Sequence, residues 1–272
     1  MTPRDAPERD EFYIGYEPGV PPRLGARLAR VVTAVVAIAV LTVVTAAALH
    51  RRLTPATFDF GHAQAVTGEL RRVPYPRLVT SGRATWLVGP GKAGAGALLD
   101  GIADGPVALE GVRIARGPHT MLEVVAGSVR SAPGGTTPAP SVPGTVGTSL
   151  VPRDAGTAAR QAHGGDEITV RGEIVDSKCF LGVMNPGEGT VHRDCARMCL
   201  RGGIPPMLLV RGAAGEEALM LLVGATNEPI GVQLAARAGQ PVSVRGRLSR
   251  DGDTLMLTTT VDAVTPLDAS DR

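Results

Sequence analysis

The sequence predicts an all-β protein with minor α-helix: an N-terminal transmembrane helix followed by two small barrel-like domains. Three observations favour this fold class. The 35 Gly and 22 Pro make up about a fifth of the chain, which is typical of short strands joined by many turns. Only 3% of the 272 residues are aromatic, so the cores must be small and built from Val, Leu, Ile and Ala. Short Val- and Gly-containing segments also recur in the same order in two parts of the chain.

The charge balance excludes two broad classes of protein. The chain has 28 basic and 26 acidic residues, a formal net charge of +2. A strongly basic nucleic-acid-binding domain would need a large positive excess. An acidic disordered chain would need a high net charge and few apolar residues, whereas 43% of this chain is hydrophobic. Composition alone does not identify a function.

A long apolar segment near the N-terminus predicts a transmembrane helix at residues 31–50. Residues 31–49 carry no charge and are bounded by Arg30 on one side and Arg51 and Arg52 on the other. At about 1.5 Å per residue this segment spans about 28 Å, close to the thickness of the hydrocarbon core of a bilayer. A signal peptide would have a shorter apolar region and a clear cleavage site. We therefore expect a retained anchor that contacts the lipid bilayer through residues 31–49.

Arginine is distributed unequally on the two sides of this segment. The first thirty residues contain more arginines than the residues that immediately follow the segment, namely Arg4, Arg9, Arg23, Arg27 and Arg30 against Arg51 and Arg52. The positive-inside rule then places residues 1–30 in the cytoplasm as an N-terminal tail. The remainder of this single-pass cell-membrane protein is expected in the periplasm or the extracellular space.

The extracytoplasmic part divides into two blocks. Residues 58–130 and 166–267 contain the apolar segments, and residues 131–165 are rich in Pro, Gly, Thr and Ala, which predicts a flexible linker. The first block opens with Val66-Thr-Gly-Glu-Leu70 and the second with Val170-Arg-Gly-Glu-Ile174. This similarity in order and spacing indicates an internal duplication, although the first block lacks a clear equivalent of one strand.

The second block carries the clearer strand pattern. We expect strands at 168–175, 207–212, 217–223, 241–248 and 254–262, with a short helix near 229–237. Asp251-Gly252-Asp253 between the last two strands is a strong hairpin signal. Three strands, a helix and two strands is the order of an OB-fold, a small five-stranded Greek-key barrel. A pair of small β-sandwiches is the alternative.

An insertion between the first two strands of the second block contains all three cysteines of the chain. A helix is expected at 191–201, with Thr190 as its N-cap and Gly202–Gly203 as its C-terminal stop. The second OB-like domain is therefore expected to carry a loop–helix insertion.

Four side chains of this insertion form a candidate metal site. On the predicted helix His192, Cys195 and Cys199 occupy positions i, i+3 and i+7, which share one face. Cys179 follows the preceding strand and can fold back across that face. Three cysteines and one histidine are a complete tetrahedral set for zinc, and thiolates also suit Cu(I).

The same cysteines admit other interpretations. Outside the cytoplasm cysteines usually pair, so a Cys179–Cys195 disulfide would make the insertion a stapled structural or interaction module. Cys199 would then be left without a partner, which is unusual in a secreted domain. A thiol–disulfide redox role for Cys195 or Cys199 is a third interpretation, and buried reduced cysteines are a fourth. A c-type haem is disfavoured because Cys-x-x-Cys-His does not occur.

The insertion resembles a motif found in uncharacterised bacterial extracytoplasmic proteins with small β-rich domains. That motif has the pattern Asp-x-x-Cys-[Phe/Tyr]-Leu, then His-x-x-Cys-Ala-x-x-Cys, then Gly-x-Pro. Here it corresponds to Asp176–Leu181, His192–Cys199 and Gly203–Pro205, with Phe180 in place of the more usual tyrosine. The resemblance covers about residues 168–212 and implies a purposeful site, but the family has no settled activity.

Other segments offer weaker signals. The glycine-rich segment 89–94 lacks the spacing of a phosphate-binding loop, and the first block has no cysteine, so we expect that block to be a scaffold. Asp176, Glu188 and Asp194 flank the cysteines as hydrogen-bonding groups, caps or surface charges. Met184, Met198 and Met207 lie near them in sequence, and thioethers suit Cu(I), but methionine is more often core filler.

Together these features predict a membrane-anchored extracytoplasmic accessory protein with a Cys/His metal or redox site. The metal is expected to be zinc or copper, and the expected partner is a membrane electron-transfer or metal-handling complex. Nucleic acid is not an expected ligand, because OB-fold binding of nucleic acid uses several aromatic side chains and this chain has one Trp. No catalytic residue can be assigned from the sequence.

Overall fold

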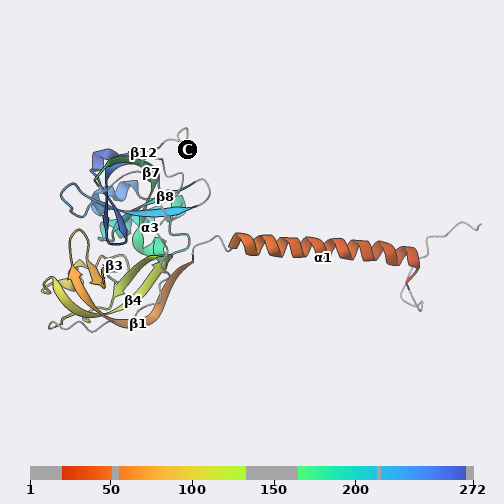
Figure 1. Cartoon of the computed structure of the whole chain (residues 1–272), viewed down its shortest axis with the longest axis horizontal. Coiled ribbons are helices and arrows are strands. Elements are labelled where there is room, and N and C mark those ends of the chain that lie inside the picture. Colours follow the sequence, from red (N-terminus) through yellow and green to blue (C-terminus); the bar gives the residue numbers. More distant parts are fainter. Residues whose placement is uncertain (1–19, 51–54, 133–164, 213–215, 268–272) are drawn as a thin grey trace, which may run out of the picture. The chain divides into compact units, whose positions relative to one another are not determined.

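A computed structural model describes residues 20–50, 55–132, 165–212 and 216–267 (Figure 1). The chain forms two compact units, Met1–Thr54 and Pro55–Arg272. Most of the linker predicted at 131–165 lies outside the described residues, as does the tail up to residue 19.

The first unit contains the helix α1 (Pro22–His50). Its residues Pro22–Leu49 have a mean hydropathy of 2.6 and are long and apolar enough to cross a membrane. The helix begins earlier than the predicted span, because Pro22 can occupy a first helical turn, where its missing N–H costs nothing. The last arginines before the apolar segment, including Arg30, are therefore helical.

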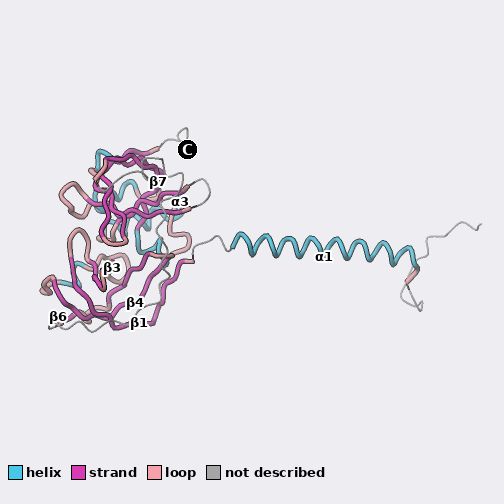
Figure 2. The backbone as a smooth tube through the Cα atoms, viewed as in Figure 1, coloured by secondary structure: helices cyan, strands magenta, loops and turns pink. Residues whose placement is uncertain are grey.

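The second unit contains two closed five-stranded barrels (Figure 2). The first consists of β1 (Ala56–Arg71), β2 (Arg77–Thr80), β3 (Arg83–Val88), β4 (Gly105–Arg116) and β5 (His119–Val124), with a short 3-10 helix, η1 (Gly96–Leu99), after β3. The strand order is β1-β2-β3-β5-β4, and β4 pairs with β1 to close the barrel. A two-residue strand, β6 (Arg130–Ser131), adds to β4.

The second barrel consists of β7 (Glu167–Asp176), β8 (Pro206–Arg211), β9 (Glu217–Val223), β10 (Pro241–Asp251) and β11 (Thr254–Thr258). Between β9 and β10 lie α4 (Gly231–Leu234) and η3 (Ala235–Arg237), and after β11 come η4 (Val261–Ala263) and β12 (Val264–Pro266). The order β7-β8-β9-β11-β10 closes through the pairing of β10 with β7.

The two barrels have the same strand order, and in each the third and fifth strands pair in parallel. The prediction of two OB-like barrels is therefore confirmed, and the β-sandwich alternative is wrong. The strand that the first block appeared to lack is β2, which has only 4 residues. It is joined to β3 by Ser81 and Gly82, which both have positive φ angles, as a tight hairpin requires.

The final strand of the second barrel is shorter than the predicted 254–262. β11 ends at Thr258, because the Thr259 hydroxyl donates a hydrogen bond back to the Arg245 carbonyl at 2.7 Å. The Thr259 amide pairs with the Val223 carbonyl at 2.9 Å, after which the chain turns into η4. The hairpin predicted at Asp251–Asp253 is confirmed by the pairing of Asp251 with Thr254.

The barrels share an apolar core where they meet. One cluster of buried side chains fills the first barrel and a second fills the second barrel. A third cluster combines residues of both, including Trp86 and Ile114 from the first barrel with Phe180 and Leu221 from the second. Burial of one continuous apolar surface by two domains favours a fixed arrangement of those domains.

Polar contacts between the barrels add to this interface. The Tyr75 hydroxyl accepts a hydrogen bond from the Ile230 amide at 2.9 Å, and burial raises the pKa of Tyr75 to about 12. Arg77, which lies over the Trp86 ring, pairs with Asp251 at 2.8 Å. The insertion between β7 and β8 lies at this junction (Figure 1).

Candidate metal centre

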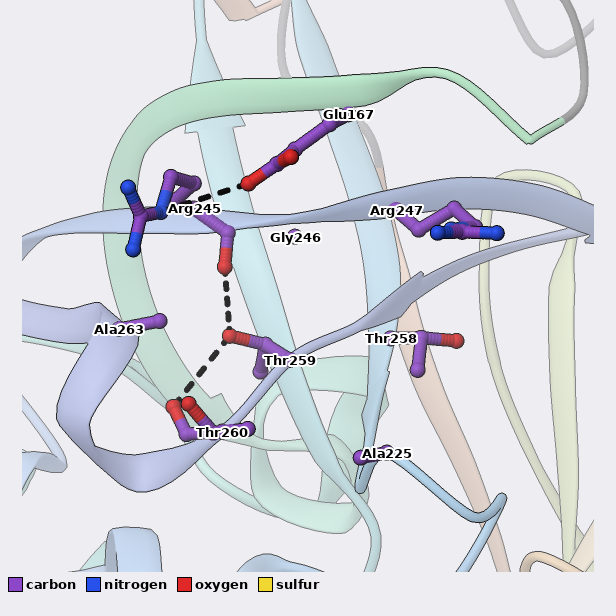
Figure 3. Close-up of a pocket in the computed structure, with 9 residues that line it drawn as sticks. All are labelled: Glu167, Ala225, Arg245, Gly246, Arg247, Thr258, Thr259, Thr260 and Ala263. Atoms are coloured by element: carbon purple, nitrogen blue, oxygen red, sulfur yellow. Dashed lines mark hydrogen bonds and ion pairs between the residues drawn. The ribbon is translucent and has the colours of Figure 1, made fainter.

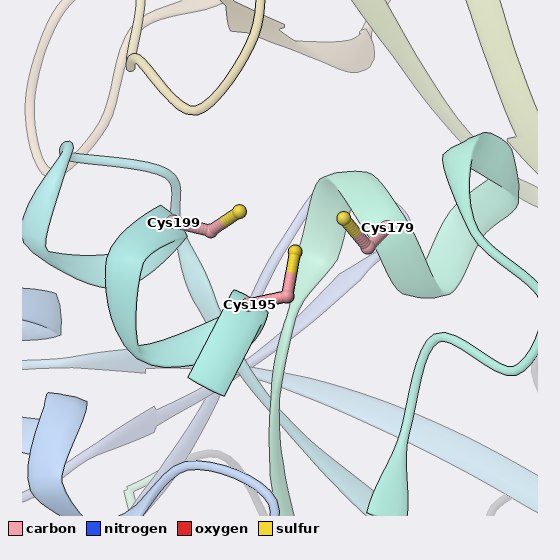
Figure 4. Close-up of side chains that lie close together, drawn as sticks. All are labelled: Cys179, Cys195 and Cys199. Atoms are coloured by element: carbon pink, nitrogen blue, oxygen red, sulfur yellow. The ribbon is translucent and has the colours of Figure 1, made fainter. Parts of the chain in front are cut away.

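The three cysteines gather at one point of the insertion (Figure 4). Cys179 opens a π-helical turn, η2 (Cys179–Val183), and Cys195 and Cys199 lie on α3 (Gly189–Arg201). The three sulfur atoms all lie within 4.8 Å of one another, and Figure 4 shows them pointing toward a common space. All three cysteines are free, so the expected alternative of a disulfide staple is not supported.

Asp176 fixes the position of Cys179. This aspartate ends β7 and is fully buried, and its carboxylate accepts a hydrogen bond from the Cys179 amide at 2.8 Å. A turn of helix is thereby started directly after the strand, because one of its free amides is satisfied. Gly182 allows close packing of this turn on the first barrel, since a Cβ atom there would lie 2.2 Å from the Thr57 carbonyl oxygen.

The helix α3 confirms the prediction at 191–201 and begins slightly earlier. Thr190 lies inside the helix, so the prediction that it is the N-cap is wrong. The carboxylate of Glu173, on β7, instead accepts a hydrogen bond from the Gly189 amide at 2.5 Å. The predicted stop at Gly202–Gly203 is confirmed, since α3 ends at Arg201 and Gly203 has a φ of 90°.

His192 lies on α3 but belongs to a second, adjoining group of donor atoms. Its side chain is 3% exposed, and its Nε2 atom lies 2.9 Å from a carboxylate oxygen of Asp176. The donor atoms of Asp176, Cys179 and His192 lie within 4.8 Å of one another. Among the described residues no such group unites His192 with all three cysteines. Cys179 is thus common to the Cys₃ cluster and to the Asp/Cys/His group.

Hydrogen bonds set the proton affinities of these groups. The hydrogen bond between Cys179 and Cys199 raises the pKa of Cys179 and lowers the pKa of Cys199. Burial and the nearby charge of Asp176 raise the pKa of Cys179 further. The hydrogen bond to Asp176 raises the pKa of His192 above its ordinary value.

The first barrel contributes directly to the cluster. Lys92 donates a hydrogen bond from its Nζ atom to the Cys195 sulfur at 3.0 Å, and this contact raises the pKa of Lys92. The first block, which was expected to be a scaffold, therefore also contributes a side chain to the surroundings of the cluster. Lys92 lies in the glycine-rich segment 89–94, which follows β3.

A buried lysine that the sequence interpretation overlooked attaches this segment to the site. Lys178 precedes Cys179 and is 1% exposed. Its ammonium group donates to the carbonyl oxygens of Gly89 at 2.8 Å and Gly91 at 2.7 Å, and it lies 2.5 Å from a carboxylate oxygen of Glu123. The only sequence signal for this role was the position of the lysine between Asp176 and the first cysteine. Its partners could not be identified from the sequence, because they lie far away along the chain.

The remaining residues named from the sequence lie away from the two donor groups. Asp194 is exposed and pairs with Arg197 at 3.3 Å, while Glu188 pairs with Arg211. Met207 is buried in the shared core, whereas the other two methionines are exposed, Met184 by 46% and Met198 by 50%. Met207 belongs to the same apolar cluster as Cys179 and Cys199.

A separate pocket of about 640 Å³ lies along β10 and β11 (Figure 3). Arg245 pairs with Glu167 at 3.4 Å on its rim, and Thr258, Thr259 and Thr260 also line it. None of the cysteines or His192 lines this pocket. The donor groups capable of holding a metal ion are thus at the junction of the barrels and not in this pocket.

In comparisons with known proteins, no family model, curated protein or solved structure matches the chain. Function is therefore inferred from the cysteine cluster and its surroundings.

Proposed function

We propose that this protein is a membrane-anchored, extracytoplasmic accessory protein that binds a soft metal ion through Cys179, Cys195 and Cys199. The observation that carries the proposal is the approach of three unpaired sulfur atoms to within 4.8 Å of one another. Thiolate ligands favour Cu(I) and zinc over hard cations. Two of the three cysteines are almost fully buried, which would shield a bound ion from water.

The choice between copper and zinc depends on the fourth donor. Structural zinc is almost always four-coordinate, as in a Cys₃His set. His192 would have to move toward the cluster to complete that set, because it is held by Asp176. Cu(I) requires no such rearrangement if the three cysteines alone are its ligands, since thiolate is a ligand type that selects Cu(I).

The apolar helix and the arginine distribution support a location for this activity. The helix α1 would anchor the chain in the cell membrane, with the barrels on the periplasmic or extracellular side. An anchored metal site outside the cytoplasm would serve a membrane electron-transfer or metal-handling complex. The resemblance of the insertion to bacterial extracytoplasmic proteins supports the same assignment.

The metal proposal predicts one bound Cu(I) or zinc ion per chain. The full chain should be purified in detergent under anaerobic, reducing conditions, loaded with each metal, and analysed for metal content by mass spectrometry. Cys179→Ser, Cys195→Ser and Cys199→Ser should each weaken binding by at least about tenfold, because each removes one soft ligand. His192→Ala separates the two ligand sets: it should impair zinc binding and spare Cu(I). Retention of the metal by all three serine variants would contradict the proposal.

A thiol–disulfide redox function is the second candidate. It is favoured by the hydrogen bond from Cys179 to Cys199, which lowers the pKa of Cys199, since the thiolate is the reactive form. Mild oxidation of the metal-free protein followed by counting of free thiols distinguishes the two functions. A redox protein would form one reversible disulfide and would bind no metal under any of the conditions above.

The proposed topology predicts the behaviour of reporters fused after Arg272. A reporter that works only outside the cytoplasm should be active, and a strictly cytoplasmic reporter should be inactive. Exchange of Arg23, Arg27 and Arg30 for glutamine should reduce the difference between the two reporter activities. Those residues supply most of the positive charge next to the apolar segment. Activity of the cytoplasmic reporter in the unaltered chain would reverse the assignment.

A further inference from the structure

The first barrel places a cation, Lys92, on the cysteine cluster of the second barrel. Lys92 is exposed, and its described side-chain contact is with the sulfur of Cys195 at 3.0 Å. We infer that Lys92 makes the site select a monovalent soft ion, Cu(I), over the divalent ion Zn(II). This inference rests on the proposed metal-binding function and names the ion that the site takes.

The backbone that carries Lys92 is held in place from both sides. The buried ammonium group of Lys178 binds the carbonyl oxygens of Gly89 and Gly91. Beyond Lys92, the Gly94 amide donates a hydrogen bond to the Gly202 carbonyl at the end of α3, at 2.7 Å. The segment is therefore fixed against the same helix that carries two of the cysteines.

The contact between the segment and α3 leaves no space for adjustment. A Cβ atom on Gly202 would lie 1.9 Å from the carbonyl oxygen of Lys92 itself. The backbone carbonyl of Lys92 thus lies directly against Gly202, in the turn that follows Cys199. These contacts fix the backbone from which the Lys92 side chain reaches the Cys195 sulfur.

The effect of this charge depends on the charge of the bound ion. An ion bonded to the Cys195 sulfur at about 2.3 Å lies within about 5 Å of the Lys92 ammonium group. Coulomb repulsion is proportional to the ionic charge, so a divalent ion is repelled twice as strongly as a monovalent one. Three thiolates attract the divalent ion more strongly, and Lys92 offsets part of that advantage.

Other charges around the cluster do not provide the same discrimination. Asp176 is buried and lies 2.9 Å from His192, but its carboxylate is the same in every Lys92 variant, so it does not alter a ratio compared between those variants. Asp194 is adjacent to Cys195 in sequence, but its side chain is 90% exposed and pairs with Arg197. Lys92 is also exposed, but its ammonium group is in contact with a ligand atom, the Cys195 sulfur.

The test compares the affinities of the two ions in matched variants of the full chain in detergent. Cu(I) affinity is measured anaerobically by competition with a chromophoric Cu(I) chelator, and Zn(II) affinity by competition with a zinc chelator. Lys92→Gln removes the charge, keeps an unbranched side chain and adds no thioether ligand for Cu(I), and Lys92→Arg keeps the charge. The control variant, Arg201→Met, removes an exposed cation at the end of α3, the helix that carries Cys195 and Cys199. The fluorescence of Trp86 verifies the fold of each variant.

We expect Lys92→Gln to raise the ratio of Zn(II) to Cu(I) affinity by about tenfold. Lys92→Arg and Arg201→Met should leave the ratio unchanged. The charge of Lys92 also changes how tightly the thiolates hold protons, and this affects the affinity for both ions. If both ions displace the same protons, the effect is equal for the two ions and leaves the ratio of their affinities unchanged. An equal change in both affinities, or the same shift in Arg201→Met, would overturn the inference while leaving the metal site intact. Failure of the unaltered protein to bind either ion would overturn the proposed function together with the inference.

Discussion

Replacement of Lys178 by methionine is expected to destabilise the second unit by about 3–5 kcal/mol. The ammonium group is almost completely buried and satisfies the carbonyl oxygens of Gly89 and Gly91 together with the carboxylate of Glu123. Removal of the cation leaves an unpaired carboxylate that is only 18% exposed, as well as two carbonyl groups without this donor. The penalty for such unpaired buried groups exceeds the value of the apolar replacement.

Urea unfolding of the full chain in detergent, followed by the fluorescence of the single Trp, measures this effect. Trp86 is 3% exposed in the first barrel, so its emission should change when that barrel opens. A double variant with Glu123→Met should recover part of the lost stability, because the unpaired carboxylate is gone. Arg83→Met is the matched control: it removes an exposed pair with Asp253 at 3.7 Å and should cost less than about 1 kcal/mol. A cost for Lys178→Met as small as that of the control would show that the buried lysine has no anchoring role.

His192 is expected to contribute stability to the metal-free protein that is lost as the pH rises above about 6.5. Its hydrogen bond to Asp176 raises the pKa of His192 in the folded state above the ordinary value of about 6.5. The folded state therefore binds this proton more tightly than the unfolded state. The resulting stabilisation is fully present below pH of about 6.5 and is lost as the pH rises through the raised pKa.

Urea unfolding in the presence of a chelator, repeated across this pH range, measures the slope. One group contributes at most about 1.4 kcal/mol per pH unit. Asp176→Asn should remove this part of the slope, because the amide no longer favours the protonated imidazole. The same variant should also lower stability at pH 6, where the ion pair is strongest. An unchanged slope in Asp176→Asn would assign the pH dependence to other groups.

The features that could be predicted from the sequence are those set by local patterns. The positions of the strands along the second block follow from alternating apolar residues and from the Asp251–Asp253 turn. Both signals depend only on neighbouring residues. The helix that carries two cysteines follows from the spacing of His192, Cys195 and Cys199 and from the two glycines that end it. Convergence of the three sulfurs then required only that the chain turn back between Cys179 and the helix.

The features that could not be predicted depend on partners far along the chain. Lys92 and Cys195 are 103 residues apart, and Lys178 and Gly89 are 89 residues apart. Neither block by itself indicates that its surface will be covered by the other. The incorrect N-cap at Thr190 has the same origin, since the group that satisfies the helix end is Glu173 on a neighbouring strand. The capping preference predicted the hydroxyl of Thr190, which is close in sequence. In the folded chain the Gly189 amide donates instead to the carboxylate of Glu173, which β7 places beside the helix end.

The direct backbone contact between the segment 89–94 and the end of α3 has a consequence for how this protein can diverge. A Cβ atom on Gly94 would lie 2.5 Å from the Gly203 carbonyl oxygen, so Gly94, like Gly202, tolerates only hydrogen as a side chain. Distant relatives that retain both barrels should keep this pair of glycines even after most surface residues have changed. Chains that have lost the first barrel are released from the constraint at Gly202. Joint retention of the two glycines is therefore expected to mark the two-barrel arrangement, independent of the cysteines.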